Sequence, residues 1–153
     1  MAFNDASFPV SAKMTNTARD IIARSGIKKL AFKIQGFSVG TGGYDNANPV
    51  QTLPIDQNQT ALANQVSPAT GYSAFQSIES IESVRIFNCR LPATLTGSDA
   101  DYGLGEIGLW AEVIESDHTE YPVGTQYLYA IAHMPIRAKT HKDVFLFRVV
   151  VNY

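Results

Sequence analysis

The C-terminal third of the chain constrains the fold most, because it holds three strand-like runs joined by turn-rich segments. These runs cover residues 105–113, 127–134 and 144–151. In the first run Ile107, Leu109, Ala111 and Val113 alternate with Glu106, Gly108, Trp110 and Glu112, which predicts a strand with one buried face. The other two runs are apolar on both faces, as interior strands are. Together they predict a compact β scaffold that favours assembly over catalysis.

The N-terminal half predicts one short helix followed by a strand. Residues 15–25 place apolar residues at helical spacing after Thr15 or Thr17 as N-cap, and Gly26 follows as a stop signal. From Leu30 onward apolar residues alternate as in a strand. The alternation changes phase at Gly36, which predicts a β-bulge at that position.

The middle of the chain is richer in turns. Residues 40–49 predict a long glycine-rich loop, and residues 59–66 predict a helical turn with Leu62 and Val66 facing inward. The polar stretch 67–83 fits neither a strand nor a helix, and a strand follows over 84–91. We therefore expect a mainly β fold, a small antiparallel β-sandwich with a short N-terminal helix and long loops. Residues 1–12 would form an N-terminal arm and residues 13–153 a single domain.

Composition excludes several functional classes. The chain has 17% charged residues, a net charge of -2 and 12 lysines and arginines without a dense basic block, so nucleic-acid binding is not expected. So few charged residues fit a surface that neighbouring subunits cover, or alternatively a neutral secreted β domain. No apolar run reaches the ~20 residues that span a bilayer, and the N-terminus has no signal-peptide pattern. The lone Cys89 lies in an apolar run and predicts a buried, inert thiol.

No residue pattern predicts catalysis or a metal site. The three histidines are His118, His133 and His141, and none has zinc-ligand spacing with Cys89. Asp99, Asp101 and Glu106 lack the ligand spacing of a calcium loop, and solvated loop carboxylates are the better interpretation. No serine lies in a Gly-x-Ser-x-Gly turn. We expect a protein that is not an enzyme and has no cofactor.

Aromatic residues allow two interpretations. Trp110, Tyr44, Tyr121 and Tyr127 could present flat faces to sugar rings, as in a carbohydrate-binding module. Trp and Tyr are also enriched at protein interfaces, which we favour. The residues expected at protein contacts are Phe3, Phe8, Trp110 and Tyr153, with the two phenylalanines docking the N-terminal arm on a neighbour.

Five segments, taken in order, resemble the N-terminal domain of bacteriophage tail-fibre proteins, the tail-collar type that joins a fibre to the baseplate. The resemblance covers roughly residues 13–153, with Ala18 in place of the usual glycine, Gln65 in place of glutamate, and a longer loop at 114–126. The segments are a Thr-Asn helix at 15–24, a strand and glycine turn at 32–43, the element at 59–66, Glu106-Ile107-Gly108-Leu109-Trp110, and the closing strands from Leu128.

This resemblance implies a virion structural protein that links tail fibres to the baseplate. Its partners would be baseplate and tail-fibre proteins, its copies would form a trimer or associate in a ring, and it would be made in the cytoplasm of the bacterial host. Because the chain stops at Tyr153 without a shaft, an adaptor or a short fibre component is expected. The alternative is a carbohydrate-binding module of a phage tail that recognises a receptor.

Overall fold

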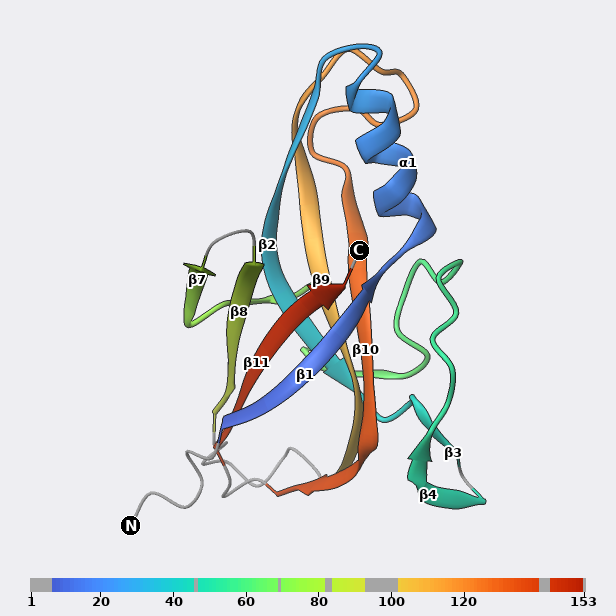
Figure 1. Cartoon of the computed structure of the whole chain (residues 1–153), viewed down its shortest axis with the longest axis vertical. Coiled ribbons are helices and arrows are strands. Elements are labelled where there is room, and N and C mark those ends of the chain that lie inside the picture. Colours follow the sequence, from blue (N-terminus) through green and yellow to red (C-terminus); the bar gives the residue numbers. More distant parts are fainter. Residues whose placement is uncertain are drawn as a thin grey trace.

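Strands dominate the structure, a computed structural model that describes residues 7–45, 47–68, 70–81, 84–92, 102–140 and 144–152. One sheet contains nine strands in the order β5-β2-β9-β10-β1-β11-β8-β7, with β6 also paired to β2, and a small second sheet pairs β3 with β4 (Figure 1). The strands are β1 (Ser7–Met14), β2 (Leu30–Gly40), β3 (Tyr44–Asp45), β4 (Asn48–Thr52), β5 (Gln65–Ser67), β6 (Ser73–Ala74), β7 (Ser77–Ile81), β8 (Val84–Leu91), β9 (Tyr102–Ser116), β10 (Gln126–Lys139) and β11 (Phe145–Asn152).

The large sheet curls, so that strands far apart in its order meet across the core. Phe75 stacks on Phe37 of β2 with ring centroids 6.1 Å apart, and packs at a tilt against Phe87 of β8 with centroids 5.1 Å apart. Strands β2 and β8 stand second and seventh in the sheet order, so these contacts require the curl visible in Figure 1. The predicted mainly β fold is confirmed, and its facing layers come from one curled sheet.

The structure corrects the extent of the predicted N-terminal arm. Residues 7–12 belong to β1, which lies inside the sheet, antiparallel to β10 and parallel to β11. Val10, Ala12 and Met14 are buried on one face, while Pro9, Ser11 and Lys13 alternate with them as exposed residues. The period-two pattern was present, but short side chains made it weak and Pro9 disguised it. The other arm residues, 1–6, lie outside the described part of the chain.

The predicted short helix is confirmed as α1 (Asn16–Ser25). The Thr15 hydroxyl caps it by accepting a hydrogen bond from the Ala18 N–H at 3.2 Å, and donates to the Leu128 carbonyl at 2.6 Å. Ala18 and Ile21 are fully buried against the sheet, which stabilises a helix too short to persist alone. Across the described residues we find no helix with the length and apolarity that crossing a membrane would take.

The loop between β9 and β10 is tied to α1 by a polar cluster. The Tyr121 hydroxyl donates to Asp20 Oδ2 at 2.7 Å, and Arg24 Nε donates to the same oxygen at 2.9 Å. These two bonds lower the pKa of Asp20, the Tyr121 bond having the larger effect. His118 Nε2 lies 3.0 Å from the Arg24 carbonyl, at the C-terminal end of the helix. The long loop is therefore an ordered brace for α1.

We expect Asp20→Asn to destabilise the protein at neutral pH and to have less effect in acid. Because folding lowers the pKa of Asp20, the ionised side chain contributes fully to the free energy of unfolding above its unfolded-state pKa of about 3.9. That contribution is lost as pH falls through the folded value. Urea unfolding of both proteins at pH 7 and at a series of pH values descending well below ~3.9 measures the difference, with Asp117→Asn in the same brace as control. A gap between Asp20→Asn and wild type that persists in acid contradicts this account.

Strands β2 and β8 follow the sequence patterns, whereas β6 and β7 lie in the stretch 67–83 that matched neither a strand nor a helix, and the small strands β3 and β4 overlap the predicted loop at 40–49. The register of β2 against β9 shifts between Ile34 and Gly36, which confirms the predicted bulge. A Cβ atom at Gly36 would lie 2.2 Å from the Ser73 carbonyl oxygen, so glycine is required where β6 meets β2. Strand β8 begins at Val84 and ends at Leu91, as predicted, and Pro92 follows it.

Candidate functional site

One face of β9 and β10 is covered by residues 41–45 and 47–64, here called the covering segment, which contains the small β3–β4 sheet. Leu62 of this segment packs with Leu128 and Ile131 in a cluster separate from the main core, and Trp110 joins it as a half-buried neighbour. A Cβ atom at Gly108 would lie 3.0 Å from the Leu62 side chain, so this glycine lets the covering segment approach closely.

Glu106 anchors the covering segment through its carboxylate. The side chain is fully buried, and Oε2 accepts hydrogen bonds from the Gly42 N–H at 2.9 Å and the Asn64 N–H at 2.8 Å. Oε1 accepts from the Ala63 N–H at 2.9 Å. Bonds of this kind to a charged acceptor are stronger than neutral ones. Glu106 is thus a structural clamp in a strand and not the solvated loop carboxylate that we expected.

This clamp also explains why residues 59–66 do not form the predicted helical turn. The backbone N–H groups of Ala63 and Asn64 point to Glu106, so they cannot serve in helical hydrogen bonds. The segment instead bends at residues 60–61 and 63–64 before it enters β5, which begins at Gln65. Leu62 is buried as predicted, whereas Val66 is half-buried.

Three further hydrogen bonds hold the covering segment, one at Leu53 and two at Gln57. His133 lies opposite Glu106 in the β9–β10 pairing, and its Nδ1 is 2.8 Å from the Leu53 carbonyl oxygen. Because a carbonyl only accepts, Nδ1 carries the hydrogen. At the start of α1, the Asn16 N–H donates to the Gln57 carbonyl at 2.7 Å, and Gln57 Nε2 donates to the Met14 carbonyl at 2.9 Å.

Of the four predicted contact residues, the structure describes Trp110 on β9 and the backbone of Phe8 on β1. Trp110 donates from Nε1 to Ser38 Oγ at 2.8 Å and packs within its own chain. Phe8 lies in β1, paired in register with Phe147 of β11. Phe3 and Tyr153 lie outside the described residues. A role in protein contacts stays a prediction for all four, and Trp110 has an internal packing role besides.

The four aromatic residues considered for sugar binding are dispersed. Tyr127 is buried in the main core, whereas Trp110 belongs to the cluster under the covering segment. Tyr121 packs on the main core and bonds Asp20. Tyr44 lies against Gly105, five residues before Trp110 on β9, or about 17 Å along a strand. They form no common aromatic platform.

Tyr127 carries a buried hydroxyl that has no hydrogen-bond partner among the described residues. Burial raises the pKa of this side chain. We expect Tyr127→Phe to leave the free energy of unfolding unchanged or to raise it by up to about 1 kcal/mol, because an unsatisfied buried hydroxyl is costly. Chemical denaturation measures this, with Tyr121→Phe as the matched control that breaks a real bond. Equal destabilisation by both variants would show that Tyr127 has a partner.

Metal and thiol chemistry find no support in the described residues. Within the described ranges, no three His, Cys, Asp or Glu side chains are placed to hold a metal ion. Asp99, Asp101 and His141 lie outside those ranges. Cys89 is fully buried, as predicted, and burial raises the pKa of its thiol.

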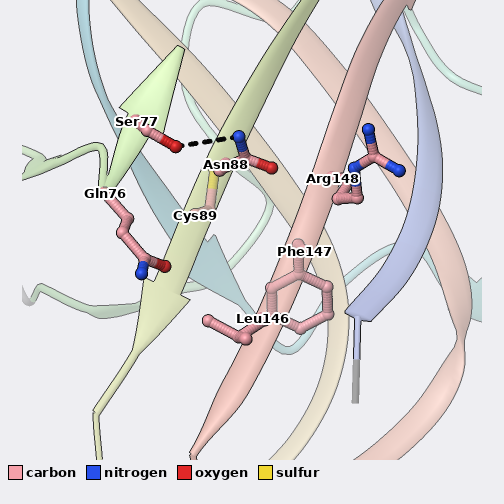
Figure 2. A pocket seen from close by; sticks show the side chains of 7 residues that line it. All are labelled: Gln76, Ser77, Asn88, Cys89, Leu146, Phe147 and Arg148. Atoms are coloured by element: carbon pink, nitrogen blue, oxygen red, sulfur yellow. Dashed lines mark hydrogen bonds between the residues drawn. The ribbon is translucent and has the colours of Figure 1, made fainter. Parts of the chain in front are cut away.

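A pocket of about 210 Å³ lies where β7, β8 and β11 run side by side (Figure 2). We call it the Arg148 pocket. Asn88 Nδ2 donates to Ser77 Oγ at 2.9 Å and to Glu79 Oε2 at 3.2 Å, and Arg148 Nη2 donates to the same Glu79 oxygen at 3.3 Å. The residues that line the Arg148 pocket are Gln76, Ser77, Asn88, Cys89, Leu146, Phe147 and Arg148.

Comparison with known proteins gives no relative on which a function could rest: no family model, no curated protein and no solved structure matches this chain.

Proposed function

We propose that this chain is a structural protein of a phage tail or a phage-like contractile machine, and that it links tail fibres to the baseplate. One observation carries the proposal: segments that resemble the fibre-attachment domain, though distant in sequence, bond to one another. Glu106 of the Glu-Ile-Gly-Leu strand clamps the glycine turn at Gly42 and the 59–66 element at Ala63 and Asn64.

The opening Thr-Asn motif takes part in the same framework. Thr15 bonds the closing strands at Leu128, and Asn16 bonds the covering segment at Gln57. The residue types that this chain shares with the attachment domain therefore lie at the positions where elements distant in the sequence bond to one another. This supports a scaffold whose surfaces, and not a catalytic centre, carry its function.

Purified particles from the producing bacterium test the proposal. We expect the chain in tail particles by mass spectrometry, and at the fibre–baseplate junction by cryo-electron microscopy of the particle. Deleting its gene should yield tails without fibres, and a plasmid copy should restore them. Isolated protein should sediment as a trimer or associate with baseplate proteins. Particles that lack the chain, or that keep their fibres without its gene, would refute the link.

A further inference from the structure

We propose that the Arg148 pocket is a socket for an acidic side chain carried on an extended segment of a partner protein. The inference rests on the proposed assembly role, since it names a surface and the partner chemistry for it. Four observations support it: unused hydrogen-bonding groups, an excess of arginine, the reach of Arg148 and an open strand edge.

The pocket presents polar groups with spare hydrogen-bonding capacity. Asn88 uses both amide hydrogens on Ser77 and Glu79, which leaves its Oδ1 without a partner among the described residues. The Gln76 side chain likewise has no partner among them. Arg148 is 46% exposed and contacts Glu79 through one nitrogen at 3.3 Å, while a guanidinium offers five donors.

The charges around the pocket favour an anionic occupant. On the face of β7, β8 and β11 that carries the pocket, the described charged residues are Arg90, Arg148 and the single acidic residue Glu79, whereas Arg85 lies on the opposite face with Phe87. This contrasts with the net charge of -2 for the whole chain. Arg90 pairs opposite Leu146, a lining residue, and therefore lies beside the pocket. A carboxylate placed there would have two guanidinium groups near it.

The existing ion pair shows that Arg148 can reach such a carboxylate. Arg148 lies on β11 and Glu79 on β7, with β8 between them. Adjacent strands are about 4.8 Å apart, so the two side chains span about 10 Å of sheet. Arg148 could therefore equally reach an acidic side chain of a partner segment that lies beside β8, on its β7 side. Arginine binds carboxylates in a two-bond geometry that Glu79 does not use here.

The backbone beside the pocket can hold an extended segment. The pairing of β7 with β8 stops at Ser77 and Asn88, and the Asn88 carbonyl accepts from the Gln76 N–H at 2.9 Å. Because backbone groups alternate between strand edges, those of Arg90 point to the same side. No described residue pairs with Arg90 there. A short strand addition at this point would bring one partner side chain into the pocket.

The size of the pocket agrees with a single side chain. Its 210 Å³ lies below the range of about 300–1,000 Å³ that is usual for small-molecule sites. Leu146 lies on the same face of β11 as Arg148 and supplies apolar surface against which the methylene groups of a glutamate can pack. We therefore assign it to a side chain of a partner protein.

Nuclear magnetic resonance titration of the full ¹⁵N-labelled chain with two blocked tripeptides tests the socket. The probes are acetyl-Val-Glu-Val-amide and its neutral isostere acetyl-Val-Gln-Val-amide, each at millimolar concentration. We expect the glutamate peptide to shift the amide signals of Gln76, Asn88 and Arg90, with about tenfold weaker binding of the glutamine peptide. Equal binding of both peptides, or no localised shift, would overturn the proposal.

Variants then locate the interaction. Arg148→Gln and Arg90→Gln should each weaken glutamate-peptide binding about tenfold, and Glu79→Gln should strengthen it by freeing Arg148. Arg85→Gln is the matched control. Arg85 lies on β8, as Arg90 does, but its guanidinium lies over the Phe87 ring on the face of the sheet opposite the pocket. Unchanged binding in Arg148→Gln would also overturn the proposal. The peptide comparison needs no particles, so the socket and the tail location can fail independently.

Discussion

Removal of residues 1–12 is expected to abolish cooperative unfolding, because it removes most of a strand from the middle of the sheet. In the sheet order β1 alone joins β10 to β11, with an antiparallel partner on one side and a parallel partner on the other. The deletion would remove six of the seven residues that pair with β11, which exposes that strand edge, and would empty the positions of Val10 and Ala12 in the core. Thermal unfolding by circular dichroism, together with amide signal dispersion, measures the effect.

The matched control for this deletion is a chain that begins at Ser7 and keeps all of β1. We expect that shorter deletion to unfold cooperatively within about 5 °C of the full chain. If the 1–12 deletion kept a similar transition, β1 would be a dispensable arm, as the sequence pattern alone suggested. The comparison therefore separates an integral strand from a segment that docks on a neighbour.

Glu106→Ala is expected to lower the free energy of unfolding by about 3–5 kcal/mol, because it removes the acceptor of three backbone hydrogen bonds. The orphaned N–H groups belong to Gly42, Ala63 and Asn64, so the covering segment should loosen as well. Urea denaturation measures the stability, and hydrogen exchange at residues 41–64 measures the loosening. Faster exchange there than in β9 would identify the clamp.

Two substitutions sharpen this test. Glu106→Gln keeps the shape but replaces one acceptor oxygen with a donor, so we expect a loss of about 2 kcal/mol. Glu112→Gln removes the same charge from a less buried position on β9, and should change stability by less than about 0.5 kcal/mol. Similar losses for Glu106→Gln and Glu112→Gln would mean that the carboxylate of Glu106 is not a clamp.

Local patterns in the sequence predicted the elements whose structure depends on neighbouring residues. The α1 helix, with Thr15 as its cap, follows from side-chain spacing along a few turns, and the Gly36 bulge follows from a phase change within one strand. The alternation over 105–113 likewise identified the buried face of Ile107 and Leu109. In each case the decisive interactions lie within a few residues, or on one face of one strand.

Three features depended on contacts between distant residues and were missed or misassigned. Strand β1 is specified by β10 and β11, whose residues are more than a hundred positions away. The helical turn at 59–66 is overridden by Glu106, about forty positions away in sequence. Glu106 was expected to be a solvated loop carboxylate, and it is buried because the fold brings the N–H groups of Gly42, Ala63 and Asn64 to it.

Periodicity and capping are local properties, and they were enough to predict a mainly β chain with one short capped helix. The place of residues 7–14 inside the sheet, the burial of Glu106 as a clamp, and the pocket that Arg148 lines with Asn88 became visible in the folded chain alone. A carboxylate or a guanidinium carries no local signature of its role. Its role depends on which distant backbone groups and charges the fold brings within hydrogen-bonding distance.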